Sequence, residues 1–178
     1  MKTRTLLVVS VLMWLAVTGA GVAQPVGTAQ VLDKPELNKL LPDAIFLDGE
    51  KCPVQKRNAV GARMEDGKLV LVTLVDTSAF SSAFEEKYVG AVLAQGKLVI
   101  GKKTLTPGTY GLGKKMEMEE GEESVTFVVY DLGGTALAEV VARKDEALRP
   151  VTPIQLKAEA GAPLRLYLGA YYVLLSSK

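Results

Sequence analysis

From residue 44 onward, short apolar runs are separated by turn residues every eight to twelve positions. This spacing is typical of an all-β sandwich or barrel, and no long amphipathic helix separates the runs as parallel βαβ units would require. Residues 154–158 and 164–168 alternate apolar and polar positions, and residues 171–175 predict a terminal strand. We therefore expect a mostly antiparallel β-sandwich of roughly nine or ten strands, with a small closed barrel as the alternative.

The dipeptide Asp66-Gly67 is the strongest turn signal in the chain. A two-residue hairpin turn there pairs Glu65 with Lys68 and, counted outward, sets Arg57 across from Asp76. The following run, residues 69–75, is almost continuously apolar and predicts a central strand covered on both faces. Three further turns are expected: a hairpin at Gln95-Gly96, a hairpin at Gly133-Gly134, and a type II turn at Pro107-Gly108.

One short helix is expected ahead of the strands. Asp33 at the cap, Pro35 in the first turn and Glu36 three residues after the cap favour a helix start. The spacing of Ser82 and Glu85 suits a second helical turn later in the chain. The leucines expected to face the domain are Leu37, Leu40 and Leu41.

The N-terminus has the layout of a secretory signal peptide. Lys2 and Arg4 precede an apolar run over residues 6–17, which is too short to span a bilayer, and small residues end at Ala23. We expect cleavage before Gln24 and export to the periplasm or the extracellular space.

Removal of residues 1–23 leaves 155 residues, a length that suits one domain. Residues 24–32 read as a lead-in segment and residues 33–178 as a single β-rich domain. The remaining chain has 19 basic and 20 acidic residues, for a net charge of −1, and no tryptophan. Such a balance favours neither nucleic acid nor an anionic membrane as a partner, and no later segment is apolar enough for a membrane span.

The sequence contains no histidine. This excludes Ser-His-Asp and Cys-His nucleophile pairs and zinc sites that need imidazole. An enzyme would have to rely on carboxylates, Lys, Tyr, Ser or the single thiol, and no cofactor is expected.

The segment from Val75 to Ala79 is similar to the Asp-Thr-Gly sequence of aspartic proteases, with Asp76 in the catalytic position. Ser78 replaces the glycine, and a second carboxylate would have to share a proton with Asp76. An ion pair with Arg57 or a cap at the end of the strand is the simpler interpretation.

Cys52 is the only cysteine, so no internal disulfide can form. Lys51 and Lys56 would favour a reactive thiolate, yet we favour a small buried side chain, because neither a resolving cysteine nor a histidine is present. Five glutamates surround Gly121 and could bind a hard cation such as calcium, but they lack the spacing of known loops. A solvated hairpin tip is the better interpretation, and no metal is expected.

These observations favour an exported, non-enzymatic binding or structural module whose ligand is an unknown protein or small molecule. The candidate contact residues are Tyr110, Tyr171 and Tyr172, beside the glycine-rich residues 108–113, where bare backbone can approach a partner. Two alternatives remain open: a carboxylate-dependent hydrolase centred on Asp76, and a barrel that holds an apolar ligand.

Four groups of segments carry a resemblance to a known family. They are Leu40-Leu41-Pro42 with Phe46, Pro53-Val54-Gln55 with Arg57-Asn58, Asp66-Gly67-Lys68-Leu69-Val70-Leu71 with Val75-Asp76-Thr77-Ser78, and Leu105-Thr106-Pro107-Gly108-Thr109-Tyr110-Gly111. Together they resemble a family of secreted bacterial proteins of unknown function. The resemblance covers most of the chain, from about residue 40 to residue 173, and implies export and an all-β domain without supplying catalytic residues.

Overall fold

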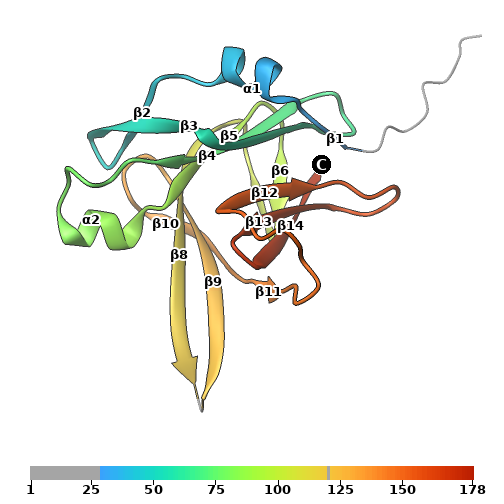
Figure 1. Cartoon of the computed structure of the whole chain (residues 1–178). Helices are drawn as coiled ribbons and strands as arrows, with labels where there is room; N and C mark the ends of the chain where they lie inside the picture. Colours follow the sequence, from blue (N-terminus) through green and yellow to red (C-terminus); the bar gives the residue numbers. More distant parts are fainter. Residues whose placement is uncertain (1–28, 120) are drawn as a thin grey trace, which may run out of the picture.

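The computed structural model describes residues 29–119 and 121–178. The expected signal peptide, residues 1–23, lies outside the described residues. Within them, fourteen strands and two short helices form two sheets that pack face to face over a shared core (Figure 1). All strand pairs are antiparallel, so the predicted antiparallel β-sandwich is confirmed.

The first sheet has eight strands and is curled like half of a barrel. Its hydrogen-bonded order is β1 (Gln30–Val31), β3 (Glu50–Arg63), β4 (Leu69–Val75), β5 (Gly90–Ala94), β8 (Gly108–Glu119), β9 (Glu122–Tyr130) and β10 (Ala136–Val141), and β2 (Ala44–Leu47) pairs with the start of β3. The end strands β1 and β10 do not pair with each other, so the closed-barrel alternative is wrong. As predicted, β4 is a central strand with most of its residues buried.

The second sheet has six strands. Its order is β12 (Ile154–Lys157), β13 (Leu164–Leu168), β14 (Tyr171–Ser177), β6 (Leu98–Ile100) and β7 (Lys103–Leu105), and β11 (Arg143–Lys144) pairs with β14. The two predicted alternating runs and the terminal strand form the continuous meander of β12, β13 and β14.

The chain crosses between the sheets after β5, after β7 and after β10. The hairpin expected at Gln95-Gly96 is therefore wrong, because β5 and β6 lie in different sheets. The Gln95 side chain instead accepts a hydrogen bond from the backbone N–H of Leu69 at 3.2 Å. Side chains from both sheets fill the space between them, among them Ile100, Leu112, Phe127 and Leu166.

The first helix, α1 (Lys34–Leu40), begins as the sequence predicts. The Asp33 carboxylate accepts a hydrogen bond from the backbone N–H of Glu36 at 2.8 Å. Leu37 and Leu41 are buried, but Leu40 is 39% exposed, so its expected inward orientation is wrong. The seven-residue helix turns only two of the three leucines toward the sheet.

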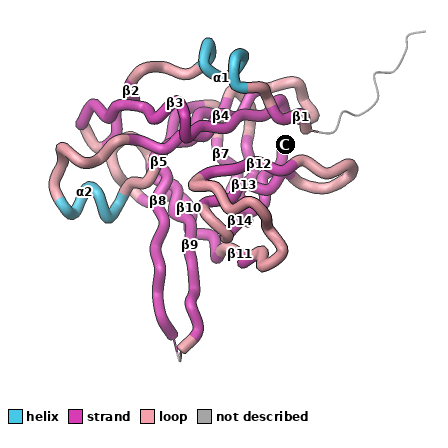
Figure 2. Tube along the Cα trace, in the orientation of Figure 1, coloured by secondary structure: helices cyan, strands magenta, loops and turns pink. Residues whose placement is uncertain are grey.

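The second helix, α2 (Ser82–Lys87), covers part of the outer face of the first sheet (Figure 2). Its N-cap is Ser81, one residue before the expected position, and the Ser81 hydroxyl accepts a hydrogen bond from the backbone N–H of Phe84 at 3.3 Å. Phe84 and Tyr88 pack with Tyr130 of β9 in a buried aromatic cluster.

The hairpin at Asp66-Gly67 forms with a three-residue loop rather than a two-residue turn. The backbone N–H of Met64 donates to the Lys68 carbonyl at 2.7 Å, and Gly67 has a φ of 77°. Such a loop shifts the expected pairing by one residue. Arg57 therefore does not face Asp76; it lies in a bulge of β3 between the pairs Val54–Val75 and Ala59–Thr73.

Of the remaining turns, the hairpin at Gly133-Gly134 is confirmed by the pairing of β9 with β10. The type II turn at Pro107-Gly108 is wrong, because Gly108 lacks the positive φ that such a turn needs and already begins β8. Within the segment expected as a lead-in, residues 24–32, Gln30–Val31 forms β1 and pairs with β3, and residues 24–28 lie outside the described residues.

Candidate binding cleft

Strands β8 and β9 continue well beyond the body of the sandwich as a two-stranded arm (Figure 1). We define the arm as residues 114–127, from the Lys114–Phe127 pair to the Glu119–Glu122 pair. The sequence builds it by alternating long polar and apolar side chains on both strands and by placing Gly121, with a φ of 87°, in the turn.

Two glycines fix the root of the arm on its outer face. A Cβ on Gly111 would lie 2.5 Å from the Tyr88 ring, and a Cβ on Gly113 would lie 2.5 Å from the Lys87 carbonyl oxygen. The end of α2 can therefore approach β8 only because these positions carry no side chain. The glycine-rich stretch predicted as a contact surface binds the protein's own helix.

The inner face of the arm continues the core, which covers it on the β9 side at Val125 and Phe127 but not on the β8 side. Side chains alternate along β8, so Met116 and Met118 lie on the same face as the buried Leu112. Leu112 is fully buried between the sheets, whereas Met116 is 58% exposed and Met118 is 71% exposed. The second sheet therefore leaves the two methionines of β8 uncovered, although it covers Val125, which pairs with Met116.

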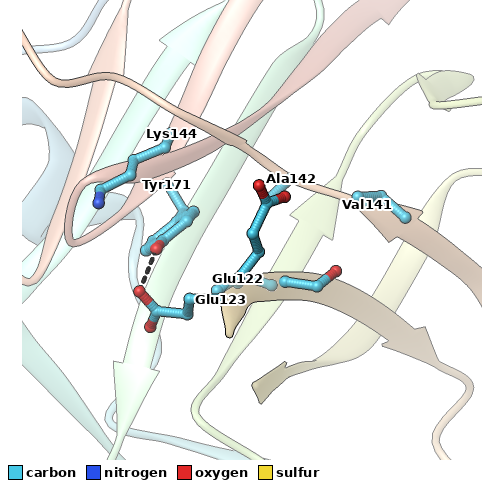
Figure 3. A pocket seen from close by; sticks show the side chains of 8 residues that line it. Glu122, Glu123, Val141, Ala142, Lys144 and Tyr171 are labelled. Carbon is cyan, nitrogen blue, oxygen red and sulfur yellow. Dashed lines mark hydrogen bonds between the residues drawn. The ribbon is translucent and has the colours of Figure 1, made fainter. Parts of the chain in front are cut away.

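A cleft of about 960 Å³ opens between the arm and the adjoining part of the second sheet (Figure 3). It is lined by Glu122, Glu123, Ser124, Val125, Val141, Ala142, Lys144 and Tyr171. Val141 is 70% exposed and adds a third uncovered apolar side chain beside the arm.

Tyr171 connects the two walls of the cleft. Its hydroxyl donates a hydrogen bond to the Glu123 carboxylate of the arm, and this bond raises the pKa of Tyr171 (Figure 3). The Lys114 ammonium lies 5.5 Å from the centre of the Tyr171 ring, within the range of a cation–π contact. These contacts hold the arm at a fixed distance from β14.

Charge is distributed unequally along the arm. Lys114 and Lys115 lie at its root, and Lys115 forms an ion pair with Glu139 of β10 at 2.8 Å. Towards the tip, the exposed carboxylates of Glu122 and Glu123 line the cleft. Lys144 is exposed on the opposite wall, and its ammonium makes no hydrogen bond or ion pair with another described side chain.

The three tyrosines singled out from the sequence have different environments. Tyr110 is 8% exposed and its hydroxyl donates to the Thr106 carbonyl at 2.6 Å, so the expectation of a surface ring is wrong. The Tyr171 ring is also buried, and only its hydroxyl reaches the cleft. Tyr172 is partly exposed on the other face of β14, where Arg165 lies 5.3 Å from its ring centre. The structure does not bring the three together as one surface.

Cys52 does not line the cleft. It lies on β3 and packs in the same hydrophobic cluster as the aromatic rings of α2 and β9. It is fully buried, as the sequence analysis favoured. Burial raises the pKa of the Cys52 thiol, and the nearby charge of Glu50 adds to that effect. The lysines expected to favour a thiolate do not do so.

Asp76 is exposed at the end of β4. Its carboxylate accepts hydrogen bonds from the Ser78 hydroxyl at 2.7 Å and from the Ser78 backbone N–H at 3.1 Å, and these bonds lower the pKa of Asp76. Among the described residues no second carboxylate is hydrogen-bonded to it, so the proton-sharing pair of an aspartic protease is not formed there.

A second hollow, of about 410 Å³, is a surface groove between α1, β3 and β12. Its walls are mostly apolar, with Leu32, Leu37 and Leu156 among them, and Arg57 and Lys34 lie at its margin. Lys34 is occupied, since its ammonium donates to the carbonyls of Arg57 and Ala59 at 3.1 and 2.7 Å.

The residues that sequence reasoning missed are Met116, Met118 and Lys144. The alternation Met116-Glu117-Met118 was a usable signal, because it marks one apolar face on β8, but nothing local indicates that this face extends beyond the second sheet.

Comparison with family models, with curated proteins and with solved structures found no match to this chain. Over the described residues, neither helix has the length and apolar character needed to cross a membrane. The same residues contain no group of three or more His, Cys, Asp or Glu side chains placed to hold a metal ion.

Proposed function

We propose that the protein is an exported, non-enzymatic module that binds another polypeptide chain through the arm and the cleft beside it. The observation that carries this proposal is the exposure of Met116 and Met118 on a face that elsewhere forms the core. Large uncovered apolar patches on soluble proteins mark interaction surfaces. A two-stranded ribbon is also marginally stable in water by itself, and a partner that covers one face would stabilise it.

Polypeptide is favoured over a small ligand by the shape of the site. The cleft is open and is lined by charged side chains of both signs, and the exposed methionines lie beside it along β8 rather than inside it. Small-molecule sites are usually concave and mostly apolar. Methionine side chains adapt their shape to the surface that covers them, which suits contact with another chain.

Export remains part of the proposal and rests on the N-terminal sequence alone. The prediction is a mature chain that begins at Gln24 and is found outside the cytoplasm. N-terminal sequencing of the protein recovered from the periplasm and from the culture medium tests it. A chain that retains residues 1–23 in every fraction would contradict it.

Methionine oxidation tests the binding role. Peroxide should convert Met116 and Met118 to the sulfoxide quickly in the dilute purified protein, and more slowly in intact cells, where the partner covers them. Met64 is only 7% exposed and is the internal control, with slow oxidation in both samples. Equal rates for Met116 and Met118 in the two samples, after correction by Met64, would contradict the proposal.

A further inference from the structure

The arm has an ordered sequence of charges along its length. From root to tip, the inner face carries the basic Lys114, then the apolar Met116 and Met118, and finally the acidic Glu123, which pairs across the ribbon with Met118. Lys144 adds positive charge on the cleft wall that faces the arm.

The order of charges on one arm is complementary to that on a second arm that runs in the opposite direction. If two arms lie antiparallel, the acidic tip of each reaches the basic root of the other and the methionines meet in the middle. In a twofold interface residue i of one copy contacts residue j of the other, and the reverse contact follows by symmetry. A parallel arrangement would place tip carboxylates against each other and be repelled.

We infer that the partner is a second copy of this chain, with the arm of each copy seated antiparallel in the cleft of the other. This inference rests on the proposed function, because it names the polypeptide that covers the arm. The near-neutral overall charge does not oppose self-association, and the ionic contacts lie at the two ends of an apolar centre.

The surface area needed for a stable dimer favours an arm that also contacts the walls of the partner's cleft over two arms that contact only each other. An arm of this length extends about 20 Å, so one face of it covers only a few hundred Å². A stable interface buries roughly 1,200 Å² or more in total. The cleft walls formed by β11 and β14, with the exposed Val141, supply the additional surface.

Charge reversal with mixing tests this arrangement in the protein purified from cells that express the full chain. We expect wild type to show a reversible monomer–dimer equilibrium by sedimentation, and Glu123→Lys or Lys144→Glu alone to weaken it about tenfold or more. A mixture of the two single variants should form a heterodimer, because each copy then supplies the charge that the other lacks. Association is restored in this mixture only if residue 123 of one copy contacts residue 144 of the other.

Two further variants separate association from folding. Glu117→Lys places the same charge change on the opposite face of β8 and should leave dimerisation unchanged. Glu123→Gln keeps an acceptor for the Tyr171 hydroxyl, so the arm should stay in place. We expect this variant to dimerise more weakly as well, because the negative charge at position 123 is lost. Circular dichroism melts establish that each variant is folded.

A wild-type protein that stays monomeric at high concentration, or a mixture of single variants that does not associate, would overturn the second-copy inference. If Met116 and Met118 are still protected in cells, the arm binds a different polypeptide and the proposed function survives. If they are unprotected as well, both proposals fail.

Discussion

The buried hydroxyl of Tyr88 gives the sharpest test of the energetics of the fold. Tyr88 is 1% exposed, and its hydroxyl makes no well-formed hydrogen bond with another described residue, although the Lys87 ammonium is close enough to act on the pKa of Tyr88. Its ring packs against Phe84 and Tyr130, with ring centres 4.7 and 5.3 Å away, and the Lys87 ammonium lies 5.1 Å from the ring centre. A phenylalanine at position 88 keeps all of these ring contacts.

Tyr88→Phe should therefore stabilise the protein. A buried polar group without a partner destabilises the folded state by about 1–3 kcal/mol, and Tyr88→Phe removes that penalty. The small cavity left by the missing oxygen offsets part of the gain. We expect a net gain of about 1 kcal/mol, which corresponds to a rise of about 2–4 °C in Tm for a domain of this size.

Tyr167→Phe is the matched control, because it removes the same atom from an equally buried ring. The Tyr167 hydroxyl donates to the Asp145 carboxylate at 2.9 Å, so its loss breaks a made hydrogen bond. We expect a loss of about 1–2 kcal/mol, since Asp145 remains partly in contact with water. Urea unfolding with an unchanged m-value measures both variants. Equal destabilisation by the two substitutions would refute the reasoning, because it would mean that the Tyr88 hydroxyl is as well bonded as that of Tyr167.

Four other outcomes follow from the structure. Gly90→Ala should destabilise the protein by about 2 kcal/mol or more, because the new Cβ would lie 2.3 Å from the Thr73 carbonyl oxygen of the neighbouring strand. Gly133→Ala meets nothing closer than 3.5 Å and should change stability by less than about 0.5 kcal/mol in the same urea titration. The Cys52 thiol, buried and with a raised pKa, should react with a thiol reagent only after unfolding; rapid labelling of the native protein would contradict its burial. Burial also raises the pKa of Tyr88, so the unfolded chain loses this proton first and the free energy of unfolding should fall as pH rises above about 10, less steeply in Tyr88→Phe.

Local patterns predicted most strands, but they did not predict which strands pair when the partners are not neighbours in sequence. The meander of β12 to β14 was predictable because each strand alternates and pairs with its neighbour in sequence. Gln95-Gly96 has the same turn chemistry as a hairpin, yet the chain there crosses to the other sheet. A glycine in a connection indicates that the chain turns, but it does not indicate to which sheet the next strand belongs.

The Asp66-Gly67 hairpin shows how a small local difference changes a functional hypothesis. The Asp66 carboxylate accepts a hydrogen bond from the backbone N–H of Lys68 at 3.0 Å and so stabilises the three-residue loop. The resulting shift of one residue, together with the bulge of β3 between Val54 and Ala59, removes the expected pairing of Arg57 with Asp76, whose backbone N–H donates to the Pro53 carbonyl instead. The dipeptide alone determines neither the loop length nor the bulge, and these two features set the surroundings of the leading catalytic candidate.

The arm could not be predicted because both its faces look ordinary in sequence. The alternation of Met116 and Met118 with glutamates is what a strand with one buried face would show, and nothing in it indicates that the opposing sheet leaves this side of the ribbon open. The arm is nevertheless held in place at both ends, at its root by the close contact of Gly113 with the end of α2 and near its tip by the Glu123–Tyr171 bond. A surface fixed in this way before contact loses less conformational entropy on binding than a flexible hairpin would. These two anchors therefore favour a rigid insertion of the arm into a matching cleft, and weakening them should slow association as well as reduce its strength.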